Sequence, residues 1–191
     1  MNLSFSEFFN LSSKYKYVND DQGTSNETET TTNFNLTGYA DIPMSAMFSI
    51  QPGISLQGKG AKYFDNGTTQ FEDNVLAIEI PVNLLANIPV GPGKFYLGGG
   101  PYAGFNVAGQ RKVTSGNNTS ESDLTFGNDA GDNIKSTDFG VNFLAGYQLS
   151  SGLNFGAGYG LGLTNLRPNS NSGTNVEQNN RVLSFTVGFA F

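Results

Sequence analysis

The last residues of the chain alternate strictly between large apolar side chains and smaller ones. One set of positions holds Leu183, Phe185, Val187, Phe189 and Phe191, and serine, threonine, glycine and alanine fill most positions between them. Because alternate residues of a β-strand point to opposite faces, this period of two predicts a strand with one apolar face. The same period recurs along the chain, so it constrains the fold more than any other feature.

Seven further segments repeat the alternation. They are 3–17, 34–42, 48–59, 76–86, 95–107, 138–149 and 153–164. Glycine gathers on the less apolar face and is densest at Gly156, Gly158, Gly160 and Gly162. Glycine weakens a strand interior and has no side chain to pack, so its abundance indicates that this face lies where larger side chains do not fit. The inside of a narrow closed barrel is such a place.

Two residues interrupt the pattern. Pro101 lies in the middle of an expected strand, and because proline cannot donate to the ladder, it predicts a bulge or weakened pairing there. Glu7 breaks the apolar face of the first segment, which predicts a bulge or register shift near this residue. The register of the first strand therefore stays open.

The connections between the eight segments alternate in length. Short turns are expected at 43–46, 87–93 and 150–152, and long polar linkers at 19–32, 61–73, 108–135 and 167–180. This alternation is typical of transmembrane barrels, which have short periplasmic turns and longer extracellular loops. The sequence predicts an all-β protein, an eight-stranded antiparallel up-and-down transmembrane β-barrel, with both termini in the periplasm. Its length fits a single outer-membrane domain over residues 1–191.

The direction of the alternation separates a membrane barrel from a soluble one. A soluble up-and-down barrel has the same period but places its apolar side chains inside. Charged residues make up only 14% of the chain, against about 25% in ordinary soluble domains, and few occupy strand positions. We therefore expect bulky apolar side chains to face lipid and glycines to face the lumen. Aromatic girdles at the membrane interfaces are expected from Tyr15, Tyr17, Phe95, Tyr147, Phe189 and Phe191.

Composition excludes several functions. The net charge of -6 argues against nucleic acid as a partner, because phosphate binding needs a basic patch. The chain has no cysteine and no histidine, which excludes thiolate metal sites and histidine-dependent outer-membrane enzymes, although catalysis by carboxylates alone stays conceivable. Segment 127–133 has oxygen ligands for Ca²⁺ but lacks EF-hand spacing, so a solvated loop is favoured. We predict no enzyme activity, no cofactor and no metal.

Four charged residues are expected to point into the lumen. They are Asp41, Lys59, Glu79 and Asp138. One interpretation is an ion path or a gate, and the other is a polar plug that fixes the interior. The plug is favoured because side chains generally fill eight-stranded barrels.

Seven short stretches resemble a known family. They are Gly38-Tyr39-Ala40-Asp41-Ile42-Pro43, Phe48-Ser49-Ile50-Gln51-Pro52, Gly58-Lys59-Gly60-Ala61, Glu79-Ile80-Pro81-Val82, Gly99-Gly100-Pro101-Tyr102-Ala103-Gly104-Phe105, Phe139-Gly140-Val141 and Gly158-Tyr159-Gly160-Leu161-Gly162-Leu163-Thr164-Asn165. In order and spacing the chain resembles the outer-membrane β-barrels common in Bacteroidota, often called PorT-like barrels. It departs from them at Glu7, Phe8 and Phe9, where members usually have a glycine-rich first strand.

The resemblance implies a place in the cell and a fold. It implies the bacterial outer membrane, outer-membrane lipid as surroundings, and barrel-assembly machinery as a partner during insertion. Phe189 and Phe191 resemble the C-terminal signal that this machinery recognises. Most members have no assigned activity, so the resemblance assigns none here.

Three functional hypotheses follow. The first is a non-enzymatic, monomeric outer-membrane barrel with a structural or surface-interaction role through its extracellular loops, whose partner is unknown. The second is a small-solute or ion pore. The third is a soluble, lipocalin-like barrel that binds an apolar ligand.

Overall fold

The computed structural model describes residues 2–19, 24–29, 31–65, 69–168 and 176–191. The strands are β1 (Asn2–Asn19), β2 (Thr24–Glu27), β3 (Thr31–Pro43), β4 (Phe48–Asp65), β5 (Thr69–Val90), β6 (Gly93–Ser115), β7 (Asn118–Asp123), β8 (Thr137–Leu149), β9 (Leu153–Gly162) and β10 (Val176–Ala190). Within these ranges, no helix is long and apolar enough to cross a bilayer.

Eight of the strands form a closed antiparallel ring. Its order is β1, β3, β4, β5, β6, β8, β9 and β10, and β10 pairs back onto β1 from Ser4↔Ala190 to Asn19↔Val176. Closure removes the free sheet edges and pairs the backbone polar groups within the wall. The predicted eight-stranded up-and-down barrel is therefore confirmed. Two short strands extend the ring at one end, where β2 pairs with β1 and β7 pairs with β6.

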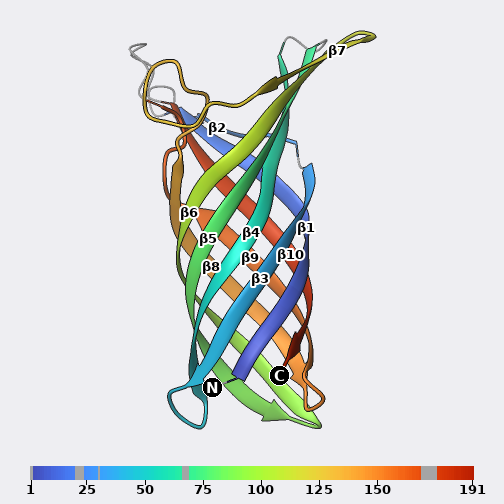
Figure 1. Ribbon diagram of the computed structural model, residues 1–191, viewed down its shortest axis with the longest axis vertical. Helices are drawn as coiled ribbons and strands as arrows, with labels where there is room; N and C mark the ends of the chain where they lie inside the picture. Colours follow the sequence, from blue (N-terminus) through green and yellow to red (C-terminus); the bar gives the residue numbers. More distant parts are fainter. Residues whose placement is uncertain (1, 20–23, 30, 66–68, 169–175) are drawn as a thin grey trace.

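Three short turns and both termini lie at the same end of the barrel (Figure 1). The turns are 44–47, 91–92 and 150–152, and Gly91 and Gly152 have φ of 57° and 95°, which favours glycine. The predicted turns are confirmed, although the second is shorter than expected because its strands run to Val90 and resume at Gly93.

Two of the predicted long linkers, 61–73 and 108–135, contain continuations of the strands, which corrects the sequence analysis. Segment 61–73 was expected to be a linker, yet β4 and β5 stay paired from Ala61↔Asp73 to Asp65↔Thr69. β6 likewise continues to Ser115 and pairs with β7. Alternation fades there because neither face of a strand beyond the lipid must be apolar, whereas the backbone ladder persists. Periodicity therefore detects only the lipid-facing part of each strand.

The bulky apolar side chains point outward. Phe143, Phe155 and Phe185 are 55%, 48% and 48% exposed, whereas Gly158 on the opposite face is buried. The predicted direction is confirmed, and a soluble barrel filled with these rings is excluded. Exposure of such an apolar exterior to water would be unfavourable, so it requires lipid around it.

The inner glycines make room for two tyrosines. A Cβ at Gly146 or Gly156 would collide with the Tyr96 hydroxyl, and one at Gly140 would collide with the Tyr102 ring. Both tyrosines come from β6, and the glycines come from β8 and β9. The glycine face is therefore the surface against which two phenol side chains of the neighbouring strand β6 pack, since Tyr96 pairs with Gly146 and Tyr102 with Gly140.

Pro101 causes no bulge. The β5–β6 register is unchanged across it, but pairing stops after Pro81↔Tyr102 and resumes at Leu84↔Gly99. The expectation of weakened pairing is thus confirmed, because a proline offers no N–H to the ladder. The bulge in this pair of strands lies instead between Leu76 and Ala77.

The irregularity of β1 lies beyond Glu7. Glu7 pairs regularly with Leu36 and Val187, and the register shifts only after Asn10, at Ser12 against β10 and at Ser13 against β3. The prediction of a shift near Glu7 is therefore wrong in position. An extra residue in a strand exchanges its two faces, so the shift determines which way the second half of β1 points.

Candidate functional site in the barrel lumen

An ionic layer crosses the lumen. Lys59 on β4 forms ion pairs with Glu79 on β5 and with Asp138 on β8, where Nζ and Oδ2 are 2.9 Å apart. No more than 2% of any of the three side chains is exposed. Ion pairs in a medium of low polarity are strong only if further hydrogen bonds satisfy the remaining polar atoms.

Three neutral side chains complete the ionic layer. Gln57 Nε2 donates to Glu79 Oε2 at 2.6 Å. Tyr102 Oη and Asn180 Nδ2 donate to Asp138 Oδ2 at 3.2 and 2.7 Å. Lys59 Nζ also lies 5.0 Å from the centre of the Tyr102 ring. The layer thus joins β4, β5, β6, β8 and β10, and it places one ammonium group between two carboxylates.

Asp41 lies apart from this layer, near the short turns. Its carboxylate pairs with Lys94 Nζ at 3.4 Å and accepts a hydrogen bond from Gln51 Nε2 at 3.3 Å. The structure therefore brings three of the four predicted lumen charges together and places the fourth in a separate pair. Lys94 was missed because it lies between the expected turn 87–93 and the start of the alternation at Phe95.

A second missed pair lies towards the other end. Arg111 donates through Nε and Nη2 to Asp73 Oδ1 and Oδ2 at 2.7 and 2.8 Å, and only 2% of the Asp73 side chain is exposed. A guanidinium and a carboxylate in this two-bonded geometry hold each other firmly. Both residues fell in segments expected to be linkers, so no strand pattern indicated that they faced each other.

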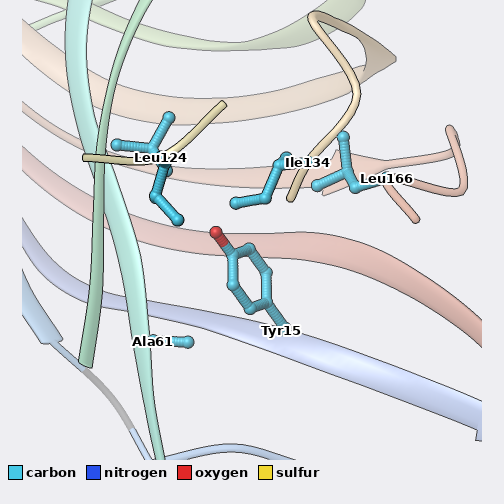
Figure 2. Packing of buried hydrophobic residues seen from close by; sticks show 6 residues of the cluster. Tyr15, Ala61, Leu124, Ile134 and Leu166 are labelled. Atoms are coloured by element: carbon cyan, nitrogen blue, oxygen red, sulfur yellow. The ribbon is translucent and has the colours of Figure 1, made fainter. Parts of the chain in front are cut away.

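An apolar cluster closes the lumen beyond the ionic layer. Tyr15, Ala61 and Val75 come from the wall, and Leu124, Ile134 and Leu166 come from the connecting segments. In Figure 2 the hydroxyl end of Tyr15 points towards Leu124 and Ile134, and Leu166 lies beside Ile134. Tyr15, Ile134 and Leu166 are each 1% exposed, so their side chains are shielded from solvent.

Backbone contacts hold the connecting segments in place. Leu124 N donates to Gly109 O at 2.9 Å, and Lys135 N donates to Leu166 O at 2.8 Å. Asn106 Nδ2 on β6 donates to Lys135 O at 2.7 Å. The only sequence signal for this cluster is that Leu124, Ile134 and Leu166 are isolated apolar residues in polar surroundings.

Tyr15 does not belong to an outer girdle, contrary to prediction. It pairs with Asn180, whose side chain is buried in the lumen, because the shift after Asn10 exchanges the faces of β1. Phe95, Phe189 and Phe191 are exposed near the short turns, and Tyr147 Oη donates to Val90 O at 2.6 Å. The Tyr17 side chain lies outside the described residues.

Comparison with known proteins gives the class. The family model described as "Outer membrane protein beta-barrel domain" matches residues 2–167. The chain therefore belongs to this family and resides in the bacterial outer membrane. Because such barrels have short periplasmic turns, we expect the end with the apolar cluster to face the outside of the cell.

Solved structures of outer-membrane barrels are similar along the whole chain. The attachment invasion locus protein Ail of Yersinia pestis is 11% identical, with coverage of 100% of this chain and 98% of Ail and a TM-score of 0.48. Neisserial surface protein A is 14% identical, with coverage of 99% and 97% and a TM-score of 0.45. Similarity this low says nothing about activity. No protein with a curated function matches the chain.

Proposed function

We propose that the protein is a non-enzymatic, non-conducting monomer that acts at the cell surface through its extracellular strands and loops. The observation that carries this proposal is the double closure of the lumen. The ionic layer around Lys59 and the apolar cluster around Tyr15 block the same passage at successive levels. Ions could cross the lumen through water only if both the ionic layer and the apolar cluster opened.

The shielding of the buried carboxylates supports a role without catalysis. Glu79 and Asp138 are 2% and 0% exposed and already hold Lys59, Gln57 and Asn180. A general acid or base must reach a substrate within hydrogen-bond distance. Both carboxylates are shielded from bulk solvent and are engaged within the ionic layer.

The β6–β7 hairpin supports a surface role. All six residues of β7 are exposed, and in the described part of the chain this strand pairs only with β6. Figure 1 shows β7 projecting beyond the rim of the barrel. A strand with one free edge offers unpaired N–H and C=O groups, which is a common way for extended partners to bind.

The finer family assignment rests on the sequence motifs. We place the chain with the PorT-like barrels of Bacteroidota because its seven stretches, from Gly38-Tyr39-Ala40 to Leu163-Thr164-Asn165, follow in the same order. We also assign Phe189 and Phe191 to recognition by the barrel-assembly machinery. Their rings are 5.2 Å apart at the end of the last strand, and both are exposed on the outer surface.

Planar-bilayer recording tests the closed lumen. We expect the reconstituted protein to give no discrete conductance steps, because no continuous water path passes the ionic layer and the apolar cluster. Insertion is verified on the same preparation by the far-UV circular dichroism of the folded barrel. Conductance steps in the unaltered protein would contradict this proposal. If the size of those steps also changed in Glu79→Gln or Lys59→Met, the protein would instead be a pore that conducts through the lumen.

Labelling of single cysteines tests which end carries the surface role. The chain has no cysteine, so each introduced thiol reports one position. On intact cells, a membrane-impermeant maleimide should label Ser120→Cys on β7 and spare Ser151→Cys in a short turn, although both positions are exposed. Ser151→Cys should react once the outer membrane is permeabilised. The reverse pattern would invert the orientation and end the proposed role of β7.

A further inference from the structure

A cavity of about 100 Å³ lies between the ionic layer and the short turns. It extends from Lys59 and Glu79 to the level of Asn87 and Lys94. The Lys94 side chain is 29% exposed, so this end of the cavity communicates with the periplasm. At about 10–15 Å³ for each water position, the cavity has room for several waters or for one small molecule.

Several buried amides facing the cavity have atoms without a hydrogen-bond partner in the protein. They are Asn83 Oδ1, Asn87 Oδ1 and Asn154 Nδ2. Asn83 and Asn154 are only 8% and 2% exposed. Each buried polar atom left without a partner costs roughly 1–3 kcal/mol. An occupant of the cavity must therefore offer both hydrogen-bond donors and acceptors.

The charges around the cavity disfavour an ionic occupant. Lys94 and Asp41 neutralise each other at the periplasmic end. At the other end, the ionic layer carries one more carboxylate than ammonium, which repels anions. The rest of the lining combines amides and hydroxyls with the phenol side chains of Tyr39 and Tyr96 and the apolar side chains of Leu85 and Leu144.

We propose that this cavity binds a neutral, hydroxyl-rich molecule of about the size of one sugar ring, which enters from the periplasm. Hydroxyl groups serve as donors and acceptors at once, as the unpartnered amide atoms of Asn83, Asn87 and Asn154 require. The C–H faces of a sugar ring pack on phenol rings, as tyrosine presents an apolar body with a polar tip. This site is independent of the proposed surface role.

Gly160 provides a way to fill the cavity. It lines the cavity, and the nearest atoms to a Cβ added there would be Asn142 Oδ1 at 3.4 Å, Val182 Cβ at 3.5 Å and Val182 O at 3.8 Å, which are ordinary contacts. Gly160→Ala therefore fits without displacing a neighbour. Gly160→Leu extends a larger side chain into the space that a ligand would occupy.

Equilibrium dialysis of radiolabelled glucose against the folded barrel in detergent tests the proposal. We expect saturable binding of one glucose in the millimolar range, weakened at least about tenfold in Gly160→Leu. Asn83→Leu and Asn154→Leu should each weaken it about three- to tenfold. Gluconate, which has the same carbon chain but carries a negative charge, should compete poorly.

Several results would overturn the site. They are the absence of saturable glucose binding, binding that Gly160→Leu leaves intact, and stronger competition by gluconate than by unlabelled glucose. Far-UV circular dichroism confirms that each variant is folded before dialysis. If Gly160→Leu does not fold, the two asparagine variants decide the outcome, since unchanged binding in both would rule out the cavity.

Discussion

Replacement of Lys59 by methionine should destabilise the barrel by roughly 3–5 kcal/mol, the usual cost of removing one partner from a buried ion pair. The change leaves the carboxylates of Glu79 and Asp138 buried together without a cation. Methionine has a similar length, so the loss reports charge rather than volume. The free energy of unfolding is measured by guanidinium titration in lipid vesicles, followed by far-UV circular dichroism.

Lys62→Met is the matched control for this prediction. Lys62 also lies on β4 and pairs with Glu72 at 3.3 Å, but its side chain is 34% exposed. Exposed pairs contribute about 0–1 kcal/mol, so this variant should remain close to the unaltered protein. Glu79→Gln should fall between the two, because it leaves one ammonium with one carboxylate. Equal losses in the two lysine variants would show that the ionic layer is not what stabilises the lumen.

Substitution of Gly146 by alanine should cost about 1–3 kcal/mol, the usual penalty of overpacking a filled interior. The new methyl group would collide with the Tyr96 hydroxyl and with the backbone carbonyl of Phe155. The carbonyl belongs to the neighbouring strand and has little freedom to move. The same unfolding titration measures the loss.

Gly160→Ala is the control, since its methyl group meets only ordinary contacts on the same inner face. Its stability should be unchanged or slightly higher, because alanine reduces the freedom of the unfolded chain. Tyr96→Ala combined with Gly146→Ala should recover part of the loss, although the carbonyl of Phe155 remains in contact. If Gly146→Ala and Gly160→Ala lose equal stability, the inner face requires glycine because of its backbone conformation and not because of contact with Tyr96.

The strand pattern predicted the barrel because lipid imposes a strict rule. Phe143, Phe155 and Phe185 must all face the bilayer, so a period of two is maintained wherever the wall contacts hydrocarbon. The same rule placed Lys59, Glu79 and Asp138 in the lumen by parity. Periodicity predicts which face of the wall a residue is on but not its position along the barrel axis, so Asp41 could not be separated from Lys59, Glu79 and Asp138.

Two features escaped the sequence for a related reason. The register shift of β1 depends on its pairing with β3 and β10, which are distant along the chain, so the inward position of Tyr15 was not visible in the local pattern. The apolar cluster depends on Leu124, Ile134 and Leu166, which meet only when the connecting segments fold back over the barrel. Long-range contacts of this kind leave no periodic trace.

The pairing of β1 with β10 sets the order of events during biogenesis. Ser4 and Ala190 are neighbours in the wall although nearly the whole chain separates them. Contacts between such distant positions form slowly, because the entropy of closing the loop is lost before the contact stabilises anything. The barrel cannot close until the last strand pairs with the first, so two strand edges stay unpaired until then.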